Sequence, residues 1–263
     1  MTANKMTGTE RGRGQDAQRH RRSRNAARLA CIACLAGGLL ALAPYLASEV
    51  AYTDLVAEVA IVRDDEQTGA DTTIDWAALQ AINGNVVAWL TVDGTSIDHP
   101  VTQPTDDMDP DYYLSHDLWN ASSSTGCIYL DQRADADGGH LLVYGHHLGW
   151  TTLMFSELFQ TYRQEEFDGI GTAVWNTPCE GATAFTPVFA MSVDMGYQDI
   201  QTFSFESSAE LRAWLLALGE ESTAQAEGWE TLCTGADRAL TLVTCSSTLG
   251  GQRERTLVVF VAA

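Results

Sequence analysis

The sequence has 263 residues, of which 45% are hydrophobic and only 6 are proline, so it can bury a core and form one sizeable domain with extensions. This composition excludes a disordered chain. The net charge of -20 is unevenly distributed: residues 1–28 carry eight basic and two acidic side chains, and the remainder carries seven basic and 33 acidic ones. The acidic body excludes nucleic acid and anionic lipid headgroups as its partners.

An uncharged segment follows the basic tail. Residues 29–47, LACIACLAGGLLALAPYLA, would form a helix close to the roughly 30 Å thickness of a bilayer core. Arginines precede this segment and no basic residue follows it before Arg63. This bias predicts a single-pass protein of the cell membrane, with a cytoplasmic N-terminus and an extracellular body. A cleaved signal peptide, cut near Ala41-Leu42-Ala43, is the alternative.

The chain therefore divides into four predicted parts. They are a basic cytoplasmic tail (1–28), a transmembrane signal-anchor (29–48), an extracytoplasmic helix and linker (49–72) and a folded domain (73–263).

The first elements beyond the anchor are predicted to be helical. The amphipathic run DLVAEVAIV (54–62) favours a helix, and the polar run RDDEQTGADTT (63–73) a spacer. Asp75 can cap a second helix, whose apolar face includes Trp76, Leu79 and Ile82 and which ends at Asn83-Gly84.

Short apolar or alternating runs then predict strands separated by turns. Asp93-Gly94 indicates a hairpin within the first run. Seven or more such strands are typical of a closed β-barrel or a sandwich. The runs are VVAWLTVDGTSIDHPV, GCIYLDQ, HLLVYGHH, TAVWN, ATAFTPVFAMSV, ALTLVTCSS and RTLVVFVA.

One late helix interrupts these strands, in ESSAELRAWLLALGEE (206–221). Ser207 and Glu210 form a capping-box pattern at its start. Gly219 is predicted to end it. Its apolar face comprises Leu211, Trp214, Leu215 and Leu218.

Cys245 is the first candidate for chemistry, because it ends an apolar strand where the chain emerges toward solvent. The alternative is a buried cysteine that packs as a small hydrophobe. Arg253 and Arg255 follow at the start of the next strand, in a body with few cations. A guanidinium beside the sulfur would stabilise a thiolate or an oxyanion; a solvated hairpin end is the alternative for each arginine.

A thiol nucleophile needs a proton partner, usually histidine. His146 and His147 are the best candidates, because they end a strand directly after Gly145, where the backbone can approach a neighbour closely. We expect surface positions for His99 and His116, which lie in turns. No spacing of cysteine and histidine predicts a zinc site, and no glycine-rich motif predicts a nucleotide.

Together these features resemble the sortases, cysteine transpeptidases of Gram-positive cell surfaces. The order is a membrane anchor, a strand ending in YGHH, a strand ending in TLVTCS, and an arginine opening the next strand. The resemblance covers residues 75–263. The segments DPDYYLSHDLWNASSSTGCIYLD and YGHHLGWTTLMFSELFQTY, and the helix at 207–218, are similar to class B members.

The resemblance implies a mainly β fold, a closed sortase-type barrel of about eight strands with peripheral helices. It makes Cys245 the nucleophile, His146 the general acid/base and Arg255 the oxyanion-stabilising cation. Arg255 is preferred to Arg253 because it directly opens the apolar strand; His147 is the alternative to His146. The loop STLGGQRE departs from the family pattern, which leaves the substrate contacts open. No metal or cofactor is implied.

The implied activity is cleavage of a sorting signal at threonine and transfer of the acyl group to an amine. The implied partners are secreted proteins with a C-terminal sorting signal, an amine acceptor from peptidoglycan or a pilin lysine, and the membrane. A class C pilin polymerase is the alternative within the family, although Asp109-Pro110-Asp111 is interpreted as part of the family block and not as a lid. A catalytically inactive surface β-barrel that binds ligands, with Cys245 disulfide-bonded to Cys233 or another partner, is the alternative from another class.

Overall fold

The computed structural model describes the chain except for a set of short segments and single residues. The residues outside the description are 1–27, 29, 39, 41, 44, 45, 49, 52, 53, 56–59, 66–68, 150 and 246–252, together with the side chains of 60–65, 69–73 and 245. Two compact units are present, Met1–Ser48 and Glu49–Ala263, and each is described by itself.

In the first unit, the predicted transmembrane segment 29–48 lies partly outside the described residues. Its described residues are helical. Within the described part of the chain, no helix has both the length and the apolar character needed to cross a bilayer. Of the predicted cytoplasmic tail, only Arg28 is described.

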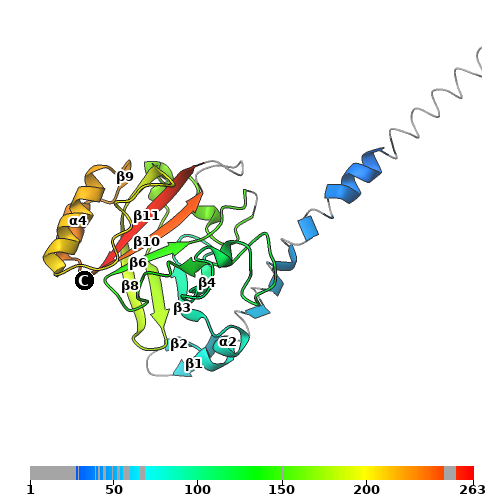
Figure 1. Cartoon of the computed structure of the whole chain (residues 1–263), viewed down its shortest axis with the longest axis horizontal. Helices are drawn as coiled ribbons and strands as arrows, with labels where there is room; N and C mark the ends of the chain where they lie inside the picture. The colour runs from blue at the N-terminus through cyan, green and yellow to red at the C-terminus, as the bar shows by residue number, and fades with distance from the viewer. Residues whose placement is uncertain are drawn as a thin grey trace, which may run out of the picture. The chain divides into compact units, whose positions relative to one another are not determined.

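The second unit is built on a closed β-barrel (Figure 1). Eight strands of the described residues form the ring in the order β3-β4-β5-β6-β10-β11-β8-β7, and β7 pairs with β3 to complete it. Among the described strands of this ring, β4–β5 and β6–β10 are parallel pairs and the other pairs are antiparallel. The predicted closed barrel is therefore confirmed. The strands are β3 (Val86–Val92), β4 (Asp98–Thr102), β5 (Tyr129–Leu130), β6 (His140–Tyr144), β7 (Ala173–Thr177), β8 (Gly181–Asp194), β10 (Arg238–Cys245) and β11 (Glu254–Ala262).

Helices and short elements surround the ring. The strand β9 (Ala224–Gln225) pairs with β8 outside the closed ring. The labelled helices of this unit are α2 (Trp76–Ile82), η1 (Tyr112–Leu114), η2 (Ser156–Leu158), α3 (Gln164–Phe167), α4 (Ser208–Glu220) and α5 (Trp229–Gly235).

Both faces of β11 are buried. Val258 and Phe260 belong to one apolar cluster, and Leu257 and Val259 belong to a second cluster. The second cluster includes the apolar face of α4, as its residue Leu215 shows. Successive side chains of a strand point to opposite faces, so a strand covered on both faces reads as a continuous apolar run. This explains the sequence pattern of TLVVFVA.

The predicted helix at 76–82 is confirmed as α2. Asp75 caps it by accepting a hydrogen bond from the N–H of Ala78 at 3.0 Å. The predicted helix and spacer at 54–73 are only partly right, because Asp54 and Leu55 are helical, but β1 (Ala60–Asp65) and β2 (Gly69–Ile74) pair as an antiparallel hairpin. Both strands contain β-branched residues, which favour a pleated backbone.

Gly219 was predicted to end the late helix. This prediction is wrong, because Gly219 lies inside α4. A Cβ atom at Gly219 would lie 2.1 Å from the Trp229 ring, so the glycine is required for the packing of α5 against α4. The expectation of a surface position for His99 is also wrong. Its side chain is buried, and burial lowers its pKa to about 4.

Candidate active site

The ends of three neighbouring strands lie together at one edge of the barrel. In the parallel pair of β6 and β10, Tyr144 is opposite Val243, and the N–H of Gly145 donates to the carbonyl of Val243 at 3.1 Å. His146 lies two residues after Tyr144, and Cys245 lies two residues after Val243. In the antiparallel pair of β10 and β11, Cys245 is opposite Arg255. The structure thus brings the backbones of all three predicted residues to the same edge, while the side chain of Cys245 lies outside the described residues.

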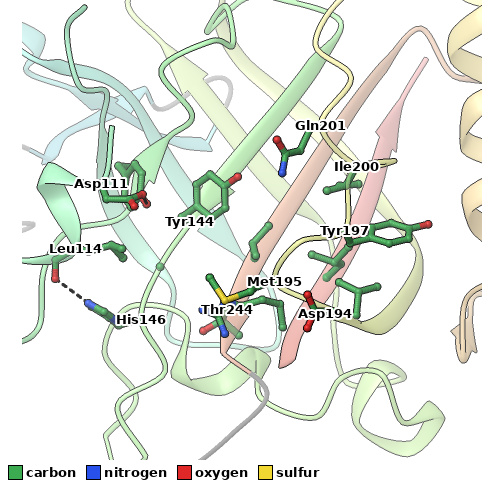
Figure 2. A pocket seen from close by; sticks show the side chains of 16 residues that line it. Asp111, Leu114, Tyr144, His146, Asp194, Met195, Tyr197, Ile200, Gln201 and Thr244 are labelled. Atoms are coloured by element: carbon green, nitrogen blue, oxygen red, sulfur yellow. Dashed lines mark hydrogen bonds between the residues drawn. The ribbon is translucent and has the colours of Figure 1, made fainter. Parts of the chain in front are cut away.

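The imidazole of His146 is held by the last residue of η1. Its Nε2 lies 2.8 Å from the carbonyl oxygen of Leu114 (Figure 2). A carbonyl oxygen only accepts hydrogen bonds, so Nε2 carries the proton. This contact fixes the tautomer and leaves proton exchange to Nδ1.

Two glycines allow the close packing around His146. A Cβ atom at Gly126, which has a φ of +63°, would lie 2.6 Å from the carbonyl oxygen of Tyr113 and 3.1 Å from the His146 ring. A Cβ atom at Gly145 would lie 2.7 Å from the Phe155 ring. The close approach predicted at Gly145 is therefore confirmed.

His147, the alternative base, faces a different neighbour. Its ring stacks on Phe159 with a centroid distance of 4.2 Å and an interplanar angle of 9°. Among the described residues, His146 lines the pocket at this edge and His147 does not. The geometry therefore favours His146 over His147.

The two arginines also differ in their surroundings. Arg253 is exposed and binds Asp194 through two hydrogen bonds, with Nε and Nη2 at 2.9 and 2.7 Å from the carboxylate oxygens. Arg255 is half-buried and lines the pocket. Its Nη1 donates to the carbonyl of Glu254 at 3.0 Å. Position in the pocket thus favours Arg255 as the cation of the site.

A pocket of about 420 Å³ opens at this edge. In Figure 2, Leu114 and His146 lie on one side of it and Tyr197 and Asp194 on the other. Sequence reasoning missed most of the lining, since it comes from separate loops. The residues described around it are Asp111, Leu114, Tyr129, Tyr144, Gly145, His146, Val193, Asp194, Met195, Tyr197, Ile200, Gln201, Val243, Thr244, Arg255 and Leu257.

Hydrogen bonds hold the polar wall of this pocket in one arrangement. The hydroxyl of Tyr144 donates to Asp131 at 3.2 Å, and the hydroxyl of Tyr129 donates to Asp111 at 3.2 Å. Burial, and then the charge of Asp131, raise the pKa of Tyr144, which keeps it protonated. Burial would raise the pKa of Asp131, but the hydrogen bonds and charge of Arg133 hold it below its ordinary value.

Thr244 also lines the pocket. Its Oγ1 atom is buried and, within the described residues, has no hydrogen-bond partner. A buried hydroxyl without a partner is costly.

The described part of the chain offers no group of side chains suited to a metal ion. Cys127, Cys179 and Cys233 are free thiols, and burial raises the pKa of Cys233 to about 12. The alternative in which Cys245 forms a disulfide with Cys233 or another cysteine stays a prediction, because the side chain of Cys245 lies outside the described residues.

No protein-family model matches the chain. Two curated relatives are similar to it. Sortase B of Listeria monocytogenes serovar 1/2a is 25% identical over 186 residues, which is 68% of this chain and 70% of the relative. Sortase B of Staphylococcus aureus is 29% identical over 92 residues, which is 34% of this chain and 36% of the relative.

Solved structures share the fold. Sortase B of Bacillus anthracis in complex with AAEK1 has a TM-score of 0.65 at 21% identity, covering 84% of this chain and 100% of that one. Sortase B of Clostridium perfringens has a TM-score of 0.60 at 24% identity, covering 70% and 97%. A sortase B–substrate complex of S. aureus has a TM-score of 0.60 at 23% identity, covering 71% and 83%.

Proposed function

We propose that Cys245, His146 and Arg255 are the catalytic residues of this chain, which is similar to the class B sortases, enzymes of the cysteine transpeptidase type. The observation that carries this proposal is the convergence of the ends of β6, β10 and β11. The backbone pairing of Cys245 with Arg255, next to the strand that leads to His146, supports a shared site.

In the first half-reaction, the thiolate of Cys245 attacks the carbonyl carbon of a threonine in a sorting signal. The C–N bond of the scissile amide breaks, and His146 gives a proton to the departing amine through Nδ1. The acyl group remains on sulfur as a thioester. Because Nε2 is engaged by the carbonyl of Leu114, the ring stays oriented while Nδ1 loses and regains its proton.

In the second half-reaction, an amine attacks the thioester carbonyl. His146 accepts the proton of the amine, the new amide bond forms, and the sulfur of Cys245 leaves as thiolate. The negative charge on the carbonyl oxygen develops in both halves. The guanidinium of Arg255 stabilises it, a contribution that is typically about 10²–10³ in rate for one oxyanion donor.

The partners follow from this chemistry. The acyl donor is a secreted protein with a C-terminal sorting signal, and the acceptor is an amine of a cell-wall peptide or of a pilin lysine. A related sortase B has been solved in complex with triglycine, a peptide that ends in a free amine. The uncharged segment 29–48 would anchor the enzyme in the cell membrane with its catalytic domain outside. A shared membrane would raise the effective concentration of anchored substrates.

Thiol labelling tests the proposed site. Iodoacetamide should alkylate Cys245 in the full-length chain, and the rate should fall after His146→Ala or Arg255→Ala. Peptide mapping separates this thiol from the exposed Cys31, Cys34 and Cys179. A protected Cys245, or labelling that neither substitution slows, would count against the proposal.

A further inference from the structure

A fixed ion pair lies at the rim of the pocket and is not used by the mechanism above. Both carboxylate oxygens of Asp194 accept hydrogen bonds from Arg253, at 2.7 and 2.9 Å. The oxygen Oδ1 also accepts from the N–H of Gly196 at 2.9 Å. The carboxylate is therefore held from two directions, although the side chains of Arg253 and Asp194 are 65% and 55% exposed.

The backbone places this pair beside Arg255. In the pairing of β8 and β11, Arg255 is opposite Val193 and Glu254 is opposite Asp194. The N–H of Met195 donates to the carbonyl of Arg253 at 2.6 Å. Asp194 (Figure 2) lines the pocket, and so does Arg255.

The charges of Arg253 and Arg255 both affect the pKa of Asp194. The pKa of Asp194 is lowered, first by its hydrogen bonds with Arg253, then by the N–H of Gly196, and also by the charge of Arg255. Asp194 thus remains an anion in the wall where the proposed oxyanion forms. An anion there opposes a developing negative charge and attracts the guanidinium that should stabilise it.

The ion pair of Arg253 and Asp194 is not explained by a contribution to folding stability. Exposed ion pairs contribute little to folding, because both charges are well solvated in the unfolded chain. A bidentate arginine–carboxylate contact does, however, fix geometry and neutralise the carboxylate.

We propose that Arg253 is a positioning residue that neutralises and holds Asp194, so that Arg255 stays directed at the substrate oxyanion. This inference rests on the proposed role of Arg255. Without Arg253, the carboxylate of Asp194 would turn to Arg255 and weaken the stabilisation of the transition state. Binding of the substrate in its ground state would change less.

The test uses the full-length chain and the best-cleaved member of a fluorogenic pentapeptide library with a fixed threonine. For Arg253→Gln we expect kcat to fall about tenfold with KM changed less than about twofold. The double variant Asp194→Asn/Arg253→Gln should recover most of kcat, because the carboxylate that competes for Arg255 is gone. Arg212→Gln is the matched control. Arg212 lies on α4 and forms an ion pair with Asp237 at 2.9 Å, and its loss should leave kcat unchanged.

Two results would overturn the inference. One is wild-type kcat in Arg253→Gln, and the other is a double variant as slow as Arg253→Gln alone, which would indicate a purely structural pair. Arg255→Ala, measured in parallel, separates the inference from its premise. Full activity in that variant would contradict the proposed role of Arg255 itself.

Discussion

His140 begins β6 and His146 follows two residues after its end, so a single strand leads from one imidazole to the other. His140 is fully buried. Its Nδ1 donates to the carbonyl of Thr202 at 2.7 Å, and its Nε2 accepts from the hydroxyl of Thr241 at 2.9 Å. Burial lowers its pKa to about 4, against the opposing effect of the Thr202 carbonyl.

His146 is half-buried and lines the pocket, with one nitrogen held by Leu114. The comparison shows how position along a strand decides what a histidine can do. Within the sheet, both nitrogens of His140 are committed to the core and the ring stays neutral. Beyond the strand end, the ring of His146 is oriented at one nitrogen and retains the other for proton transfer.

The largest difference should appear when each histidine is removed. His146→Ala should lower kcat/KM for the threonine peptide by about 10³-fold, as expected for loss of a general acid/base, with little change in the free energy of unfolding. His140→Ala should instead lower the free energy of unfolding by about 2–4 kcal/mol, because Thr241 loses its partner and a cavity forms. Urea unfolding and peptide cleavage of both variants check this. A reversed pattern would contradict the assignment of the two histidines.

The orientation of His146 can be disturbed without removing it. In Gly126→Ala, the new methyl group would crowd the carbonyls of Tyr113 and Leu114 and the His146 ring. We expect kcat to fall about 10- to 100-fold, since misplacement of about 1 Å costs this much.

Gly228→Ala is the control for this variant. Gly228 has a similar φ of +71°, and a Cβ atom added there would meet nothing within 4 Å among the described residues. It should share the backbone strain and keep its activity. Equal loss of activity in both variants would show that strain, and not the position of His146, is responsible.

Sequence reasoning was most successful where a pattern is local. Alternation and turn residues predict the strands, and each proposed catalytic residue stands at or just beyond an end of its strand. Contacts between distant segments were not predictable in this way. Three such contacts join residues from separate elements: the hydrogen bond between Leu114 and His146, the ion pair of Arg253 with Asp194, and the packing of Trp229 on Gly219. Gly219 was misread because a glycine near a helix end signals a stop unless a bulky neighbour covers it.

A further prediction concerns pH. The pKa values of His99 and His140 are lowered to about 4 in the folded chain, so below about pH 6.5 the unfolded chain binds protons that the folded chain does not. Stability is fully present above about pH 6.5 and falls as the pH decreases toward about 4. From about pH 7 to about pH 5 we expect a loss of about 2 kcal/mol for each histidine.

Urea unfolding at both pH values, on the wild type and on His140→Asn, measures this loss. The variant should start less stable and show a weaker dependence on pH. An unchanged dependence would mean that His140 is not the neutral, buried group described above.

The most direct test of the shared site is the intact mass of the full-length chain after incubation with the threonine peptide. The account predicts an acyl adduct on Cys245 that hydroxylamine releases, that triglycine converts to a new peptide, and that forms far more slowly in His146→Ala and Arg255→Ala. An adduct on another residue, or equal acylation of Cys245 in all three proteins, would contradict it.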